Sequence, residues 1–119
     1  MLDDLQNLSS AVGRAVRSAP DVPAVECDGV VLTYAELDAH ADRLARALAS
    51  RGVGPEDVVA VAVPRSIELV VALLAIVRAG AAYLPLDPDY PAERTAHMVE
   101  VARPVLTLGP AEVAEWWGG

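Results

Sequence analysis

The chain has 119 residues, of which 54% are hydrophobic and 22% are charged, which suits one globular domain spanning residues 1–119. The formal charge is −8, an excess of acid that argues against nucleic-acid binding and against an anionic membrane surface. All the basic residues are arginines, so these residues cannot supply a phosphate-binding lysine or a Schiff-base lysine.

Cysteine content and the N-terminus bear on the compartment. The single cysteine, Cys27, cannot form an internal disulfide, which is typical of a reducing environment. Acidic side chains lie near Met1, where a signal peptide needs basic ones, and the most apolar run, residues 69–77, is far shorter than the roughly 20 residues of a membrane span. We therefore expect a cytoplasmic protein without a membrane partner.

The first predicted elements are a helix and a hairpin. Residues 2–19 have apolar side chains at helical spacing (Leu2, Leu5, Leu8, Val12 and Val16). Pro20 and Pro23 end this helix. Residues 24–27 and 30–32 are short apolar runs on either side of Asp28-Gly29, a pair typical of a type I′ hairpin turn.

A helix start is encoded next. Thr33 and Glu36 have the spacing of a capping box, in which each side chain accepts a hydrogen bond from the other residue's backbone N–H. Leu32 and Leu37 occupy the positions of a hydrophobic staple around this cap. The helix is predicted to continue to residue 48 on one apolar face and to end at Gly52.

The second half of the chain alternates strands with helices. Residues 58–63 are all apolar, a pattern that favours a strand buried on both faces of a parallel sheet. Strands are predicted at 58–63, 81–84 and 104–108, and helices at 67–77, 91–102 and 110–117. The predicted fold class is therefore α/β, with helices packed on a mostly parallel sheet and a β-hairpin near the N-terminus.

The residues that usually carry chemistry show no catalytic, cofactor-binding or metal-binding pattern. His40 and His97 lie on different predicted helices without further ligands at zinc spacing, and we expect both on helix surfaces. Cys27 is expected to be a small core or edge residue. Asp87 and Asp89 suit turn formation or helix capping better than metal binding, and no glycine-rich phosphate loop occurs.

Two adjacent tryptophans, Trp116 and Trp117, lie near the end of the chain. Both indoles cannot face one helix stripe. Either one packs on the core and the other is partly exposed, or the pair anchors a protein partner, since tryptophan is enriched at interface hot spots. The sequence leaves these two readings open.

Two segments resemble core motifs of the adenylation domains of nonribosomal peptide synthetases, members of the adenylate-forming, AMP-binding superfamily. Residues 32–37 (LTYAEL) are similar to the first motif, and residues 77–94 (VRAGAAYLPLDPDYPAER) to the second. The family's structural motif residues in this chain are Leu32, Thr33, Tyr34, Glu36, Leu37, Gly80, Tyr83, Pro85, Asp87, Tyr90 and Pro91.

The resemblance implies a partial N-terminal subdomain of an enzyme that activates an amino acid with ATP and loads it on a carrier protein. In that family the phosphate loop, the aspartate that holds the amino group, the acid that grips the ribose and the catalytic lysine lie downstream of this region. The resemblance therefore implies a fragment truncated before the phosphate loop, with no catalytic residue and no cofactor of its own.

Three hypotheses for the function follow. The first is an inactive binding or scaffold protein in nonribosomal peptide biosynthesis, which contacts a synthetase module, a carrier protein or a tailoring enzyme and forms a homodimer or a tight heterocomplex. The second is one half of a split adenylating enzyme completed by another chain. The third is a remnant without a function of its own.

Overall fold

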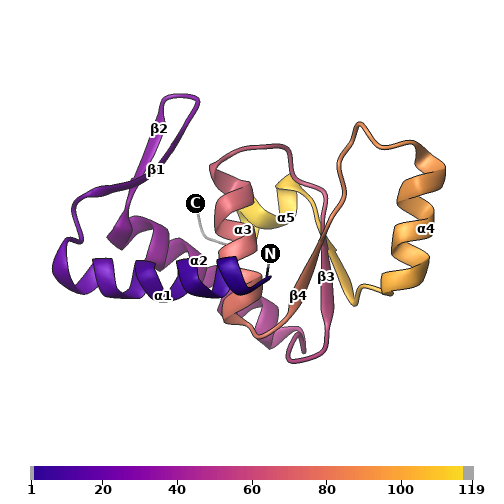
Figure 1. Ribbon diagram of the computed structural model, residues 1–119, viewed down its shortest axis with the longest axis horizontal. Coiled ribbons are helices and arrows are strands. Elements are labelled where there is room, and N and C mark those ends of the chain that lie inside the picture. The colour runs from indigo at the N-terminus through magenta and orange to yellow at the C-terminus, as the bar shows by residue number, and fades with distance from the viewer. Residues whose placement is uncertain (1, 117–119) are drawn as a thin grey trace.

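The computed structural model describes the backbone of residues 2–116 and the side chains of residues 9–115. Figure 1 shows the elements in chain order. They are α1 (Leu2–Ser18), β1 (Pro23–Cys27), β2 (Val30–Thr33), α2 (Tyr34–Ser50), β3 (Val58–Val61), α3 (Ile67–Arg78), β4 (Ala82–Pro85), α4 (Ala92–Ala102), β5 (Leu106–Leu108) and α5 (Pro110–Trp116).

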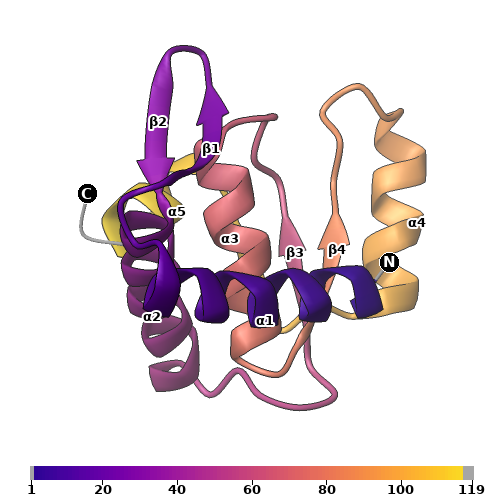
Figure 2. The same ribbon diagram turned by 60° about the vertical axis from the view of Figure 1, so that its left-hand side comes forward.

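The N-terminal hairpin forms as predicted. Strands β1 and β2 pair antiparallel, with Cys27 opposite Val30. Asp28 and Gly29 between them have φ angles of 51° and 80°, the positive values that a type I′ turn requires. Figure 2 shows the hairpin projecting beyond the helices as a separate two-stranded ribbon.

The predicted capping box begins α2. Thr33 Oγ1 accepts a hydrogen bond from the Glu36 N–H (3.2 Å), and Glu36 Oε1 accepts one from the Thr33 N–H (2.9 Å). Leu32 and Leu37 are both buried beside this cap. Gly52, with a φ of 87°, reverses the chain after the helix.

The main sheet has three parallel strands in the order β4-β3-β5. Helix α3 joins β3 to β4 on one face of this sheet, and α4 joins β4 to β5 on the opposite face (Figure 1). The predicted α/β fold is thus confirmed. The strands differ slightly from prediction: β3 ends at Val61 and not at residue 63, and β5 begins at Leu106 and not at Pro104, which has no N–H for a ladder.

The hydrophobic core lies between the main sheet and the helices on its α3 face. Its buried members come from α1, α2, α3, α5, β3 and β5, among them Val12, Leu44, Leu48, Val59, Val61, Leu74, Ile76, Leu108 and Val113. The side chains of Leu2, Leu5 and Leu8, which the sequence placed on the same stripe as Val12, lie outside the described residues. Helix α4 contributes no buried residue.

A polar contact ties three helices together. The side chain of Arg78, at the end of α3, is only 16% exposed, and its Nη2 lies 2.8 Å from Asp38 Oδ1 in α2. Its Nη1 donates to the Asp38 carbonyl oxygen (3.2 Å), and its Nε donates to Ser9 Oγ in α1 (3.3 Å). Arg78 therefore fixes α1 and α2 against the end of α3.

Within residues 2–116, no helix has both the length and the apolar character needed to cross a bilayer.

Candidate functional site

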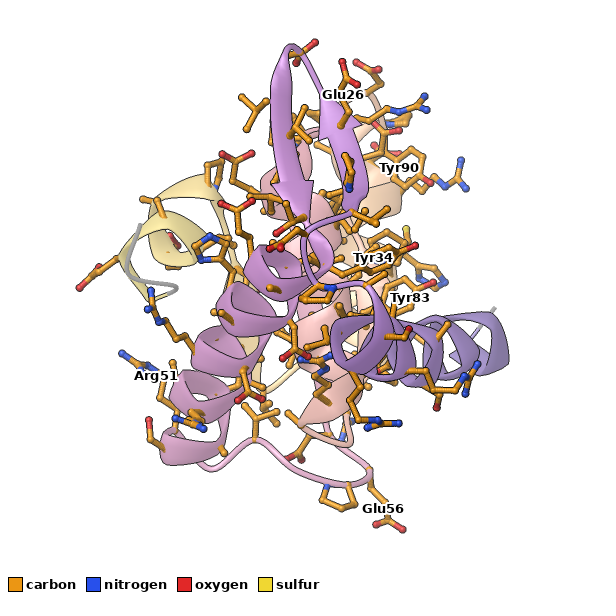
Figure 3. All side chains as sticks on the ribbon, turned by 90° about the vertical axis from the view of Figure 1, so that its left-hand side faces the viewer. Glu26, Tyr34, Arg51, Glu56, Tyr83 and Tyr90 are labelled. Atoms are coloured by element: carbon orange, nitrogen blue, oxygen red, sulfur yellow. The ribbon has the colours of Figure 1, made fainter. Side chains whose placement is uncertain are left out.

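A hollow of about 410 Å³ opens at the carboxyl end of the main sheet. Its walls come from the segments that follow β3, β4 and β5 and from the first turn of α4, and the lining residues are Ala62, Pro64, Leu86, Asp87, Pro88, Tyr90, Thr95 and Pro110. In Figure 2, the arrows of β3 and β4 point toward the end of the molecule at which the hairpin stands. Figure 3 shows Tyr90 and Glu26 toward that end and Glu56 at the opposite one.

The position of the hollow follows from the topology. After β3 the chain leaves for α3 on one face of the sheet, whereas after the neighbouring β4 it leaves for α4 on the other face (Figure 1). Where two adjacent parallel strands send their connections to opposite faces, a crevice remains at their carboxyl ends. Ligands of open α/β sheets bind in this kind of crevice.

Hydrogen bonds hold the walls of the hollow in place. The Leu86 N–H donates to the Val61 carbonyl oxygen and the Ala62 N–H to the Leu108 carbonyl oxygen, both at 2.8 Å, so each extends the ladder beyond the strands. The carbonyl oxygen of Pro64 accepts a hydrogen bond from Ser66 Oγ (2.8 Å). The hollow is therefore built on backbone that the sheet already fixes.

The loop after β4 is a tight turn, as the sequence predicted for its two aspartates. Asp87 Oδ1 accepts a hydrogen bond from the Asp89 N–H (2.8 Å), and the Asp87 carbonyl oxygen accepts one from the Tyr90 N–H (3.0 Å). The Arg94 guanidinium lies over the Tyr90 ring, 4.2 Å from its centroid. In the described residues, no three His, Cys, Asp or Glu side chains converge as metal ligands would.

The structure separates the two sequence motifs. Residues 32–37 lie at the start of α2, in the helical layer, whereas the second motif runs from the end of α3 through β4 into α4. Of the second motif, Leu86, Asp87, Pro88 and Tyr90 line the hollow. Tyr34 and Tyr83 pack, partly buried, against the core.

The remaining motif residues shape the backbone. Gly80 turns the chain between α3 and β4 with a φ of 86° and lies against Pro55. Pro85 is the exposed last residue of β4, and Pro91 is the residue from which α4 begins.

The other candidates from the sequence lie apart from each other and from the hollow. His40 is on α2 and His97 is exposed on α4. Cys27 packs, partly buried, against the core. The side chain of Trp116 and the whole of Trp117 lie outside the described residues, so the reading of this pair as a partner anchor stays a prediction.

Sequence analysis missed four residues of the hollow: Ala62, Pro64, Thr95 and Pro110. Ala62 lies near the end of the predicted strand 58–63, Pro64 follows that strand directly, and Pro110 comes two residues after the predicted strand 104–108. Position after a parallel strand was the signal that would have found them, because the carboxyl ends of parallel strands meet at one edge.

A second feature is the sheet face on the α4 side, here called the open sheet face. Side chains alternate along a strand, and Val59 and Val61 point to the core, so Ala60 and its register partners Leu84 and Thr107 point to the α4 side. Of these three, Ala60 is buried, Leu84 is partly buried and Thr107 is exposed. By the same alternation Val105, before β5, points to this side and is 56% exposed, and Val101, on α4, is 69% exposed. Within the described residues, β4 and β5 are the edge strands of the sheet.

Comparison with known proteins places these features in a family. The AMP-binding enzyme family model matches residues 12–116. The chain is 54% identical over 95 residues to a dimodular nonribosomal peptide synthase of Bacillus subtilis (strain 168), with 80% of this chain and 4% of that protein covered. It is 51% identical over 108 residues to the phosphinothricin tripeptide synthetase PhsB of Streptomyces viridochromogenes, with coverages of 88% and 9%.

A shorter relative matches in the same way. Novobiocin biosynthesis protein H of Streptomyces niveus is 48% identical over 93 residues, with 78% of this chain and 16% of that protein covered. The chain thus spans between 4% and 16% of the length of these three relatives.

Proposed function

We propose that this chain, which belongs to the AMP-binding enzyme family, serves nonribosomal peptide synthesis as a binding scaffold and not as a catalyst. Its partner in this proposal is a protein of the same pathway: a synthetase module, a carrier protein or a tailoring enzyme. The matched relatives that are named as peptide synthetases support the pathway.

The motif residues make contacts that shape the backbone, and this supports a structural role for the chain. Thr33 and Glu36 cap a helix, Gly80 turns the chain, and Asp87 closes a loop. The 119 residues also hold no lysine, so the family's catalytic lysines would have to come from other residues. The chain by itself is therefore proposed to leave ATP and amino acids unreacted.

One observation carries the proposal of a docking partner: four helices pack on one face of the main sheet, whereas on the other face Ala60 is buried but Thr107 is exposed. Parallel sheets are normally buried on both faces. Here α4 alone lies on the second face and contributes no buried residue, and exposed valines flank that face. An apolar surface of this kind, between two edge strands, is typical of a protein interface.

The test uses two matched variants expressed in the native host. Val101→Asp/Val105→Asp places charges beside the open sheet face, and the control, Val30→Asp, places one at a valine of similar exposure on the hairpin (55% against 56% for Val105). We expect the wild type and the control to co-purify with a synthetase module, a carrier protein or a tailoring enzyme of the pathway, and the double variant to lose it. Equal recovery by all three would overturn the proposal.

A split adenylating enzyme is the second candidate, and the two edge strands favour it, since strands of another chain could extend the sheet. This candidate predicts ATP–pyrophosphate exchange only when the chain is mixed with a polypeptide that carries the phosphate loop and the catalytic lysine. Exchange by the mixture and by neither component would replace the scaffold with the split enzyme. Exchange by the pure chain alone would overturn both.

A further inference from the structure

We propose that the hollow at the carboxyl end of the main sheet binds a small organic cation with an apolar body. This site is separate from the open sheet face, so the proposal does not rest on the scaffold function. The ligand class follows from the size, the lining and the charge of the hollow.

The size and lining suit a small, mostly apolar molecule. A volume of about 410 Å³ lies within the usual range of ligand pockets, roughly 300 to 1,000 Å³. Three prolines, an alanine, a leucine and a tyrosine ring supply most of the wall. Such a lining stabilises a ligand through removal of its apolar surface from water.

The charge of the lining selects a cation. Asp87 is the one charged residue among the eight that line the hollow. The bond from the Asp89 N–H orients its carboxylate. The Arg94 guanidinium, which stacks on the Tyr90 ring, is a positive charge beside the hollow, but Arg94 is not one of the lining residues. A chain with a net charge of −8 reinforces the preference, since a ligand anion meets repulsion from the carboxylate and from the molecule as a whole.

The hollow is also pre-formed, which lowers the cost of binding. Pro64, Pro88 and Pro110 have fixed φ angles, and ladder hydrogen bonds hold Ala62 and Leu86. Little conformational entropy is lost when a ligand enters walls that are already ordered.

The test compares three probes of matched shape on the full chain. Benzylamine, benzyl alcohol and benzoate share one ring and differ in charge, and their binding is followed by two-dimensional ¹H–¹⁵N NMR. We expect saturable shifts centred on residues 86–90 and on Ala62, with benzylamine the tightest ligand and benzoate the weakest. Equal affinity for benzylamine and benzyl alcohol, or shifts centred elsewhere, would overturn the proposal.

Two variants then locate the charge. Asp87→Asn removes the carboxylate charge and keeps an oxygen that accepts the Asp89 N–H. Asp89→Asn removes the same charge from a loop residue that does not line the hollow. We expect Asp87→Asn to weaken benzylamine about 2- to 5-fold, as for an exposed ion pair, with benzyl alcohol unchanged and Asp89→Asn close to wild type. Equal effects of the two variants would contradict a direct contact, and the probe series tests the proposal even if a variant fails to fold.

Discussion

At the scale of single residues, the α2 cap combines hydrogen bonding with electrostatics. The Thr33 backbone N–H donates a hydrogen bond to the Glu36 carboxylate, and the Glu36 backbone N–H donates one to the Thr33 hydroxyl oxygen. The bond from the Thr33 N–H to the carboxylate holds the pKa of Glu36 below its ordinary value, and the Thr33 side chain is the next cause. Thr33 and Glu36, three positions apart, thus fix the start of α2 and lower the pKa of the Glu36 carboxyl.

Removal of the cap hydroxyl should destabilise the fold. Thr33→Ala leaves the Glu36 N–H without its side-chain acceptor, and we expect the free energy of unfolding in urea to fall by about 1 kcal/mol. Thr107→Ala is the control, because it removes an exposed threonine hydroxyl from a strand. A loss at Thr107 as large as that at Thr33 would contradict the capping role.

The same cap predicts a pH dependence. Because the folded state lowers the pKa of Glu36, the unfolded state binds the proton more readily, so this contribution to stability is complete above the ordinary value of 4.5. It is lost as the pH falls through the lower folded pKa. Urea unfolding from about pH 6 to about pH 3 should therefore show a shallower decline for Glu36→Gln than for the wild type. Parallel curves would mean that the cap does not titrate as proposed.

At the scale of elements, Arg78 decides how the N-terminal helices pack. It is mostly buried and reaches Asp38 on α2 and Ser9 on α1. In contrast, Arg46 and Asp42 form a pair one turn apart on the exposed side of α2, with 3.2 Å between nitrogen and oxygen. The ion pair of the mostly buried Arg78 should therefore contribute more to stability than that of the exposed Arg46.

The two pairs give a matched prediction. Arg78→Ala leaves the Asp38 carboxylate, which is 35% exposed, without its partner and also removes the approach of Arg78 Nη1 to Asp42 Oδ1 (3.9 Å). We expect a loss of about 2 kcal/mol in unfolding free energy. Arg46→Ala should cost less than about 1 kcal/mol, since exposed pairs contribute little. Amide hydrogen exchange in α1 should also become faster in Arg78→Ala and stay unchanged in Arg46→Ala. Unchanged exchange in α1 would show that Arg78 does not hold that helix.

At the scale of the whole molecule, the uneven covering of the main sheet matters most. Helices α1, α2, α3 and α5 share a core on one face, and α4 on the other buries none of its residues. A mean hydropathy of +0.34 accompanies this exposed surface. Without a partner, the open sheet face is the surface through which copies of the chain would associate.

Self-association is therefore predicted for the purified chain. Sedimentation velocity over a micromolar concentration series should show a dimer or larger species for the wild type and for Val30→Asp, and a shift to monomer for Val101→Asp/Val105→Asp. The charges act by making the valine surface costly to bury. A wild type that stays monomeric throughout would contradict the homodimer expected from the sequence.

Local signals account for what could be predicted. Asp28-Gly29 predicted the hairpin turn, and Thr33 with Glu36 predicted the start of α2, because each signal acts through backbone groups within a few residues. The apolar run at 58–63 predicted a buried strand but not its length, since β3 pairs only from Val58 to Val61 and the apolar pattern does not mark where pairing ends. The motif resemblance predicted the family that the comparisons then identified.

The candidate site could be predicted only in part. Asp87 and Tyr90 were singled out by their motif, while Ala62, Thr95 and Pro110 carry no local signal of binding. They meet because β3, β4 and β5 run parallel and send α3 and α4 to opposite faces.

The sequence by itself thus determined the hairpin turn, the cap of α2, the alternation of strands and helices and the family. Each depends on residues close in the chain or on a contiguous motif. The tertiary structure alone decided the strand order β4-β3-β5, the contact of Arg78 with Ser9 and Asp38, the hollow and the open sheet face. These depend on which distant segments pack together, and packing is set by the whole core and not by any one segment.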